Sequence, residues 1–318
     1  MRASVIIPTF KRPAMVQRLL ANLAKCRFPH EIEICVVENG PQSGVEQVCA
    51  SNPIEGRVRY LHLAVAGRSS ALNHAIRESG ADFFIFFDDD VTVPEEMIAT
   101  YVDAANRYGA GHFFGGPLVA DAESKCPSHL LPYLPWSAKG WTFADQECEV
   151  PADKFTYFFG ANWAVFRSDL LRTGLFSEEL GVTDSKFSPV GEELELQKRL
   201  LSMGVKPIFL PGAVINHYVP AECYTLAWVW RREFRRGVME WKMSERFEGP
   251  RHKILGVPRW LVRAAAEQSI RAAKSRLFKD PPEKQTEISM REAHLAGLLF
   301  GAWSDRGRGS LAAEGKPA

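Results

Sequence analysis

Three consecutive aspartates, Asp88, Asp89 and Asp90, are the residues whose type and spacing most directly suggest chemistry. They follow five apolar residues, Phe83–Phe87, which predict a strand buried on both faces of a parallel sheet. The aspartates would then lie at the carboxyl end of that strand, where open α/β sheets bind ligands. Adjacent carboxylates repel one another unless a cation or hydrogen-bond donors hold them, and Mg²⁺ or Mn²⁺ prefers such oxygens together with substrate phosphates.

A solvated acidic turn would explain the same three residues. Pro94, followed by Glu95 and Glu96, is typical of a helix start. The aspartates would then be part of the turn that leads into this helix. The stretch alone therefore leaves both a metal site and an acidic turn open.

The composition indicates an ordinary globular protein. The chain has 318 residues, of which 46% are hydrophobic and 24% charged, and its net charge is +1. A nearly balanced charge argues against nucleic acid as the main partner. No apolar run is long enough to predict a membrane-spanning helix, and the N-terminus lacks the apolar region of a signal peptide. The six cysteines show no CxxC spacing, so we expect free thiols and a cytoplasmic location.

The elements that must position the aspartates alternate along the first 115 residues. Strands are predicted over residues 3–7, 31–37, 58–63 and 83–87, with a helical pattern after each of the first three. This alternation predicts parallel strands, right-handed crossovers and helices on both faces of the sheet. We therefore expect these residues to form a nucleotide-binding half-sheet.

Two glycines mark places where a ligand could approach the backbone. Gly67 and Arg68 open the third helix, where N–H groups and a guanidinium could hold a phosphate, although an exposed arginine after a glycine is also compatible. Gly160 interrupts the apolar run Phe155–Phe166, as where a backbone passes close to a ligand.

Residues 126–150 carry Trp136 and Trp141 without a regular period, which indicates either a substrate surface or a loop packed on its own aromatics.

A second acidic group, Glu192 and Glu193, follows Gly191 and opens a predicted helix that ends at Gly204. Acidic residues in a first helical turn suit the helix dipole, which alone would explain Glu192 and also Glu195. Short strands predicted over residues 208–210 and 214–215 lead to Asn216-His217-Tyr218. A single histidine of this kind is usually packed or solvated.

The chain after Pro220 is predicted to be helical. The first helix carries an apolar face of Trp230, Phe234, Val238 and Trp241 beside Arg231, Arg232, Arg235 and Arg236. Such a basic amphipathic helix could lie on an anionic membrane surface through residues 228–241, contact acceptor phosphates, or pack on the preceding domain.

Two further helices are predicted nearer the C-terminus. Residues Pro258–Phe278 form a helix with an apolar stripe of Val262, Ala266, Ile270, Ala273 and Leu277. The segment Ser289–Glu292 predicts a capping box for the last helix. We expect the tail from Arg306 to be disordered.

Seven segments in one order resemble family 2 glycosyltransferases, which are inverting enzymes with the GT-A fold that use nucleotide sugars. They are SVIIPTFKRP, VVENG, AGRSSALNHAI, FFIFFDDDVTVP, GANWAVFR, GEELELQKRL and INHYVP. The resemblance covers residues 3–237. It implies an α/β fold with a Rossmann-like, mostly parallel central sheet, helices on both faces and a C-terminal helical extension. We expect a catalytic domain over 1–220, with a nucleotide-binding half (1–115) and an acceptor-binding half (116–220), a helical region over 221–305 and a tail over 306–318.

The resemblance also implies roles for the acidic residues. Asp88–Asp90 match the DXD motif, in which Asp88 and Asp90 would contact the nucleotide ribose and a divalent metal, Mn²⁺ or Mg²⁺, and His217 would complete the metal coordination. Asp89 would also lie at the nucleotide sugar. Glu193 would be the general base, although the family's usual acid there is Asp, so Glu192 or Glu195 is an alternative.

The other implied site residues bind the two substrates. The donor would be held by Pro8, Thr9, Arg12, Glu38, Gly67, Arg68 and Asn73. The acceptor would be met by Trp136, Trp141, Asn162 and Trp163. The acceptor is expected to be a glycan, a lipid-linked sugar or a small molecule, in surface polysaccharide or glycolipid biosynthesis. No QxxRW motif follows His217, so we expect single addition by a cytoplasmic enzyme, which could be peripheral at the inner face of the membrane.

Two other functions are compatible with parts of the sequence. Asp88–Thr92 satisfies the DxDxT pattern of haloacid-dehalogenase-type phosphatases, with Asp88 as nucleophile. That fold also needs a late strand ending in paired aspartates, whereas here a glutamate pair opens a helix. A non-catalytic nucleotide-sugar-binding module is the second alternative, and metal-dependent hydrolysis of a nucleotide sugar would distinguish an enzyme from such a module.

Overall fold

The computed structural model describes residues 1–28, 32–54, 56–155, 157–243 and 253–305. The chain divides into two compact units. The first comprises residues 1–123, 135–184 and 192–219, and the second comprises residues 124–134, 185–191 and those from 220 onward. The last change of unit falls at residue 220, and two earlier segments also belong to the second unit. The tail predicted over 306–318 lies outside the described residues.

An eight-stranded sheet forms the centre of the first unit, in the order β3-β2-β1-β4-β9-β6-β10-β8. The strands are β1 (Ala3–Thr9), β2 (Ile32–Asn39), β3 (Val58–Leu63), β4 (Phe83–Phe86), β6 (His112–Gly115), β8 (Cys148–Glu149), β9 (Trp163–Phe166) and β10 (Lys206–Phe209). The first four are parallel, which confirms the prediction from their alternation with helices. β9 runs antiparallel between β4 and β6. The sheet is therefore mixed but mostly parallel, as expected for the GT-A fold.

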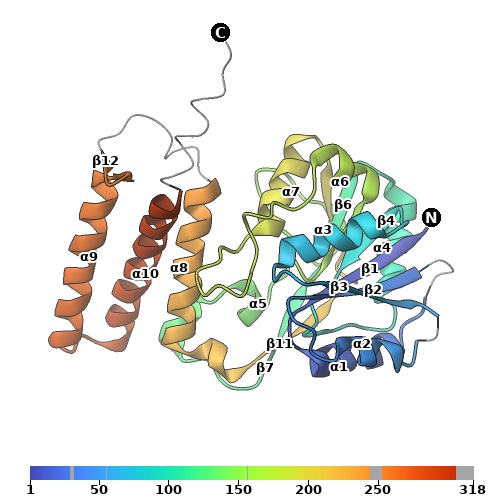
Figure 1. The fold of residues 1–318 in the computed structure, drawn as a ribbon, viewed down its shortest axis with the longest axis horizontal. Coiled ribbons are helices and arrows are strands. Elements are labelled where there is room, and N and C mark those ends of the chain that lie inside the picture. The colour runs from blue at the N-terminus through green and yellow to red at the C-terminus, as the bar shows by residue number, and fades with distance from the viewer. Residues whose placement is uncertain (29–31, 55, 156, 244–252, 306–318) are drawn as a thin grey trace, which may run out of the picture. The chain divides into compact units, whose positions relative to one another are not determined.

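Helices cover both faces of this sheet (Figure 1). Side chains alternate between the two faces of a strand, so Val5 and Ile7 of β1 pack in one core and Ile6 in the other. One face is covered by α1 (Pro13–Leu23), α2 (Val45–Ala50) and α4 (Met97–Tyr108), and the other by α3 (Arg68–Glu78), α6 (Arg167–Thr173) and α7 (Glu192–Ser202).

A small second sheet places the segment that contains His217. It consists of β5 (Val91–Thr92), β11 (Ile215–Val219) and β7 (Leu118–Ala122), with β11 in the middle. The predicted strand over 214–215 was too short, because backbone bonds to both neighbours extend β11 through His217 to Val219. The irregular stretch 126–150 contains two short helices, η1 (Ser128–Tyr133) and α5 (Trp136–Lys139), before β8.

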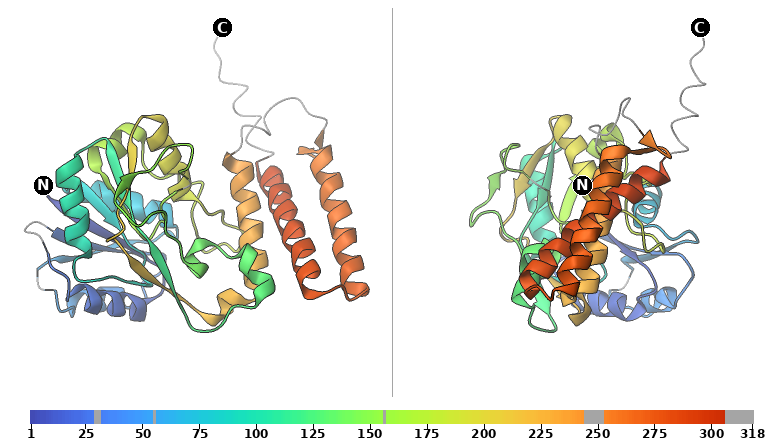
Figure 2. Two further views of the ribbon diagram at one scale, coloured as in Figure 1. Left: turned by 180° about the vertical axis from the view of Figure 1, so that it is seen from behind. Right: turned by 90° about the vertical axis from the view of Figure 1, so that its left-hand side faces the viewer.

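The second unit is helical (Figure 2). It contains η2 (Ala221–Tyr224), α8 (Leu226–Met243), the hairpin strands β12 (Lys253–Ile254) and β13 (Val257–Pro258), α9 (Arg259–Leu277) and α10 (Pro282–Ser304). α10 packs against both α8 and α9. Phe234 and Val238 of α8 are buried with Ala293 of α10, and the helices approach so closely that a Cβ on Gly297 would lie 2.0 Å from the Phe234 carbonyl oxygen.

Two expectations for the last helices differ from the structure. The predicted capping box Ser289–Glu292 lies inside α10, because Pro282 takes the first helical position and starts the helix earlier. The apolar stripe of α9 is not its packed face. That helix buries Leu261, Gln268, Ala272 and Ser275, while the side chains of the stripe are exposed or half-buried.

None of the described helices is both long and apolar enough to cross a membrane.

Candidate active site

Arg68, the first residue of α3, joins the two acidic groups of the sequence. Its Nη2 and Nη1 lie 2.7 and 3.0 Å from the two carboxylate oxygens of Asp88, a bidentate pair. Its Nε lies 3.0 Å from Oε1 of Glu192, whose side chain is only 3% exposed. The aspartates after β4 and the acidic first turn of α7 are therefore held together by one guanidinium.

Strand order explains why Gly160 lies beside this arginine. β4 and β9 are antiparallel with Phe86 opposite Trp163, so the residues just before β9 lie next to those just after β4. A Cβ on Gly160 would be 3.0 Å from Nη2 of Arg68 and 3.1 Å from the carboxyl carbon of Glu193. The close approach expected at Gly160 is thus made by the side chains of the site itself.

Asp89 connects the aspartates to the loop after β1. Its carboxylate is buried and accepts a hydrogen bond from Thr9 Oγ1 at 2.7 Å and one from Arg12 Nη1 at 3.1 Å. The same nitrogen of Arg12 donates to Asp90 Oδ2 at 2.9 Å. Burial raises the pKa of Asp89 to about 6, and the charge of Arg12 acts in the opposite direction. Thr9 and Asp89, both expected at the nucleotide, are engaged with each other.

Asp90 and His217 face one another across the edge of the small sheet. The pairing of β11 with β5 brings Nε2 of His217 to 3.4 Å from Asp90 Oδ1. That oxygen is buried and makes no hydrogen bond within the described part of the chain. Burial also raises the pKa of the neighbouring Asp88, and the charge of Arg68 opposes this rise. An unpaired buried oxygen next to an imidazole nitrogen is an arrangement that suits a cation.

No group of three or more acidic, histidine or cysteine side chains is preassembled as a metal site among the described residues. The predicted set of Asp88, Asp90 and His217 is not brought together as three ligands, because Asp88 is paired with Arg68. Mg²⁺ is usually bound by one or two carboxylates together with substrate phosphates. Asp90 and His217 could therefore supply the protein ligands of such an ion, and substrate phosphates would supply others.

Glu193 differs from the other two acids of the first turn of α7. Glu192 is paired with Arg68, and Glu195 binds Arg199 through two hydrogen bonds of 2.6 and 2.8 Å. Oε2 of Glu193 is buried without a partner in the described chain, although the residue as a whole is partly exposed. Burial raises the pKa of Glu193 to about 8, and the charge of Glu192 adds to the rise. This carboxyl group is therefore mostly protonated at neutral pH and can accept a proton at higher pH.

Two residues expected at the nucleotide shape the surrounding loops instead. The Glu38 carboxylate accepts hydrogen bonds from the amide and hydroxyl of Ser43, at 2.7 and 2.6 Å, and from the Tyr60 hydroxyl at 2.7 Å. The buried Asn73 side chain bonds to the backbone N–H and carbonyl of Phe176. Both side chains are therefore occupied in holding loops at the carboxyl edge of the sheet.

Asn39 is a site residue that the sequence analysis missed. Its Nδ2 donates to the Thr9 carbonyl oxygen at 2.8 Å, and its Oδ1 accepts from the Gly67 amide at 2.9 Å. Asn39 thereby links the ends of β1 and β2 to the start of α3. Pro8 is a buried residue of β1 just before this link. The sequence Glu38-Asn39-Gly40, where β2 ends, was the available clue, because asparagine side chains commonly bond to nearby backbone at turns.

The residues expected at the acceptor fall into two groups. Trp136 stacks between Trp141 and Tyr157, with ring centroids 5.1 and 4.9 Å apart, and all three are half-buried. Asn162 and Trp163, in contrast, are 0% and 1% exposed. Three hydrogen bonds hold the Asn162 side chain and Trp163 stacks on Phe86, so both side chains belong to the core.

Comparisons with known proteins agree with this fold. The family model described as "Glycosyl transferase family 2" matches residues 4–172. The chain is 25% identical to the probable glycosyltransferase YdaM of Bacillus subtilis over 74% of its own length and 55% of that protein, so it spans about half of that relative. It is 23% identical to the succinoglycan biosynthesis protein ExoM of Rhizobium meliloti, over 92% of this chain and 90% of that protein.

A solved structure supports the same fold assignment. The mannosyltransferase PcManGT from Pyrobaculum calidifontis, in complex with GDP-Man and Mn²⁺, superimposes with a TM-score of 0.59. The superposition covers 95% of this chain and 87% of that chain at 19% sequence identity. At this identity the likeness establishes the fold.

We expect Gly160→Ala to preserve the fold but to disturb the site. The added methyl would meet the ends of the Arg68 and Glu193 side chains, which can move at little cost to stability. Displacing catalytic groups by about 1 Å can lower a rate by about 100-fold. Thermal unfolding and catalytic rate should be compared with Gly212→Ala, whose methyl would have only an ordinary contact at 3.8 Å. Equal rates for the two variants would contradict a functional role for this close approach.

Proposed function

Since the chain belongs to glycosyl transferase family 2, we propose that it transfers a sugar from a nucleoside-diphosphate sugar to an acceptor hydroxyl, with inversion at the anomeric carbon. The observation that carries this proposal is the bridge from Asp88 through Arg68 to Glu192. It joins a segment suited to a nucleotide and a cation with a helix start that offers a base, Glu193. Both halves of a displacement reaction thus lie around one arginine.

Cationic groups on the donor side would receive the diphosphate. Arg12 is half-exposed and Arg68 borders the same aspartates, so both guanidiniums are close to where the phosphates would lie. Asp90 and His217 would hold a divalent cation, Mn²⁺ or Mg²⁺, in line with the Mn²⁺ in the PcManGT complex. When bound, such a cation supplies positive charge that stabilises the leaving nucleoside diphosphate.

Glu193 would remove the proton from the acceptor hydroxyl as the oxygen attacks the anomeric carbon. It is the acid of this turn whose Oε2 lacks a partner in the described chain, and its raised pKa suits proton transfer near neutral to mildly alkaline pH. Glu192 would act as a positioning residue because it holds Arg68 and its charge raises the pKa of Glu193. We therefore favour Glu193 over Glu192 and Glu195 as the base.

The aromatic stack of Trp136, Trp141 and Tyr157 would bind the acceptor. Ligand sites are lined mainly by aromatic and apolar side chains with a few polar groups that set orientation. The stack follows β7 in the chain and meets the sheet through Trp141, which contacts Phe158 and Phe209. An acceptor sugar in polysaccharide biosynthesis fits this surface, and the similarity to ExoM points to the same class of pathway.

The two alternative functions fare differently. Family membership argues against the phosphatase, and the glutamate pair opens α7 and does not end a strand. A binding module without catalysis would keep the same fold, so turnover is the property that separates it from an enzyme. Metal-dependent hydrolysis of the donor in the absence of acceptor would support catalysis.

We expect one nucleoside diphosphate to stabilise the protein only when a divalent metal is present. At 100 times its dissociation constant a ligand adds about 2.7 kcal/mol to the free energy of unfolding, which raises the melting temperature by several degrees. Thermal-shift titrations with UDP, GDP, dTDP and CDP, each with Mn²⁺ or EDTA, would measure this. Asp90→Asn should abolish the shift, whereas Asp103→Asn, an exposed acid on α4, should retain it. A metal-independent shift, or none, would contradict the proposed cation site.

We expect the kcat/KM of the wild-type enzyme to rise as the pH increases through about 8, because Glu193 must lose its proton to act as a base. Glu193→Gln should lower kcat by about 100-fold to 10,000-fold, the usual contribution of a general base, and remove this pH dependence. Glu195→Gln is the matched control, since it removes a charge from the same turn but from a carboxylate paired with Arg199. If Glu195→Gln had the larger effect, the base would be assigned wrongly.

We expect Trp136→Ala to raise KM for the acceptor while leaving the affinity for the donor nucleotide unchanged. The substitution removes the middle ring of the stack, on which Trp141 and Tyr157 depend for their position. Steady-state kinetics with varied acceptor, together with the nucleotide thermal shift, would separate the two effects. A loss of nucleotide binding without a change in acceptor KM would place the stack on the donor side.

A further inference from the structure

α9 exposes an apolar surface that its packing does not need. Its buried residues lie on one side of the helix, and the opposite side carries apolar side chains in water. Trp260, Ile270, Leu277 and Phe278 are 41%, 58%, 75% and 74% exposed. Because an α-helix turns by about 100° per residue, these four side chains fall within a sector of about 100°. We call this sector the outer face of α9.

Basic residues share the outer face. The helical period places Arg259, Arg263, Arg271 and Lys274 in or at the border of the same sector, with Glu267 as its one acid. Glu267 is paired with Arg263 at 2.7 Å, so the face keeps a positive net charge. From Arg259 to Lys279 the chain has six lysine and arginine residues and one acidic residue.

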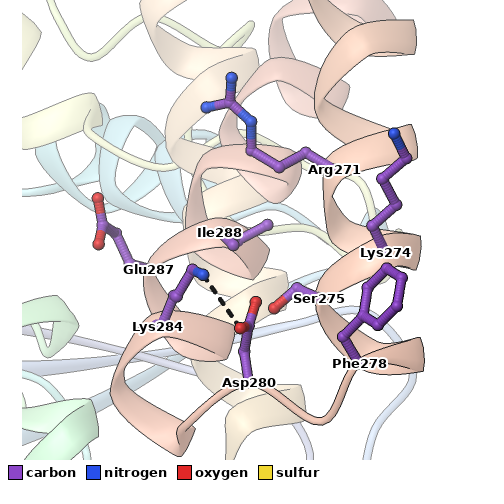
Figure 3. Close-up of a pocket in the computed structure, with 8 residues that line it drawn as sticks. All are labelled: Arg271, Lys274, Ser275, Phe278, Asp280, Lys284, Glu287 and Ile288. Atoms are coloured by element: carbon purple, nitrogen blue, oxygen red, sulfur yellow. Dashed lines mark hydrogen bonds and ion pairs between the residues drawn. The ribbon is translucent and has the colours of Figure 1, made fainter.

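A hollow beside the outer face is lined by two of these cations, Arg271 and Lys274 (Figure 3). It has a volume of about 590 Å³ and lies between the C-terminal half of α9 and the start of α10. Arg271, Lys274 and Phe278 line it from or next to α9, and Lys284 lines it from α10. Asp280 and Glu287 also line it, but Asp280 is paired with Lys284 at 3.0 Å, so the cations of α9 are not neutralised by it. The hollow has the size and charge to take an anionic headgroup next to an exposed phenylalanine.

The hairpin before α9 adds further exposed apolar side chains. Leu255 is 84% exposed and Ile254 is 46% exposed. Leu255 has a φ of 51°, a left-handed conformation that two-residue hairpin turns usually reserve for Asn, Asp or Gly. A leucine in this position is not buried and adds backbone strain, so it does not stabilise the fold through packing.

α8 is the weaker candidate for a membrane contact, although the sequence pointed to it. Its apolar face is occupied by α10, since Phe234 and Val238 are buried with Ala293. Its arginines are also partly engaged, because Arg236 pairs with Glu233 and Arg235 donates to the Lys186 carbonyl oxygen. An interfacial helix needs a free apolar face as well as positive charge, and α9 has both.

We propose that the outer face of α9 docks on an anionic lipid bilayer, with Ile270, Leu277 and Phe278 entering the acyl boundary and Arg271 and Lys274 binding lipid phosphates. Charge complementarity favours this occupant, because each basic residue near an anionic membrane adds to the attraction. A bilayer also accepts apolar side chains at both ends of the helix without a shaped partner. The inference is independent of the proposed reaction.

Vesicle flotation of the full-length protein tests the proposal. Wild type should float with vesicles of phosphatidylcholine and phosphatidylglycerol in equal amounts, should bind pure phosphatidylcholine at least about tenfold more weakly, and should be released by high salt. Arg271→Glu/Lys274→Glu and the uncharged pair Leu277→Asn/Phe278→Asn should each lower binding at least about tenfold. These side chains are exposed, so thermal unfolding should confirm that both variants remain folded.

The matched control is Arg231→Glu/Arg232→Glu, which makes the same charge change on α8. It should leave flotation near the wild-type level. Three outcomes would overturn the proposal: equal binding of wild type to both kinds of vesicle, loss of binding in the α8 variant but not in the α9 variants, or a wild-type dimer in light scattering that Leu277→Asn/Phe278→Asn converts to a monomer. The last result would make the outer face a contact between copies of the chain.

Discussion

An excess of buried negative charge is the constraint on which this site depends. Within the described chain, its acids share two guanidinium groups, those of Arg12 and Arg68. The acids are Asp88, Asp89, Asp90, Glu192 and Glu193. Burial cannot be tolerated for so many carboxylates unless cations pair with them or protons neutralise them. Burial raises the pKa of Glu193 to about 8, so near neutral pH a proton neutralises part of this excess there, whereas Asp89, whose pKa is raised to about 6, stays mostly ionised.

The proposed chemistry follows from this imbalance. A diphosphate brings more negative charge, so it can enter only with additional positive charge, which gives a divalent cation a physical reason to bind with the donor. Oδ1 of Asp90 is buried without a hydrogen-bond partner in the described chain, so its negative charge is poorly compensated. In the proposed reaction donor, cation and base would therefore be coupled through electrostatics, and Arg68 is the group whose charge acts on Asp88, Glu192 and Glu193.

The strands and helices at the start of the first unit could be predicted because their apolar residues recur with a clear period. β1 to β4 alternate with helices, and β4 is an apolar run that ends in acids. The position of β9 could not be predicted, because its antiparallel insertion between β4 and β6 depends on pairing between strands distant in sequence. The resemblance placed Asn162 and Trp163 at the acceptor, whereas the pairing of β9 within the sheet buries both side chains.

Roles within the acidic groups were equally inaccessible from the sequence. Glu192 and Glu193 are neighbours on a helix and point about 100° apart, so only the structure shows which one reaches Arg68. The same period explains the difference on α9, where one stripe of apolar residues was evident but the packed side is made by Leu261, Gln268, Ala272 and Ser275. Small and polar residues fit against α10 at close range, and this cannot be recognised from hydrophobicity alone.

The chain passes between the two units directly before the turn that carries Glu193. Residues 185–191 belong to the second unit, and the first unit resumes at Glu192. The first unit is therefore not continuous in sequence, and ending the chain at residue 220 would not isolate it. Residues 124–134 and 185–191 of the second unit would remain attached without the rest of that unit. α7 begins at Glu192, so residues 185–191 of the second unit are joined by a single peptide bond to the turn that carries Glu193. Removing the chain from residue 220 onward would therefore leave the segment that leads directly into this turn without the rest of its compact unit.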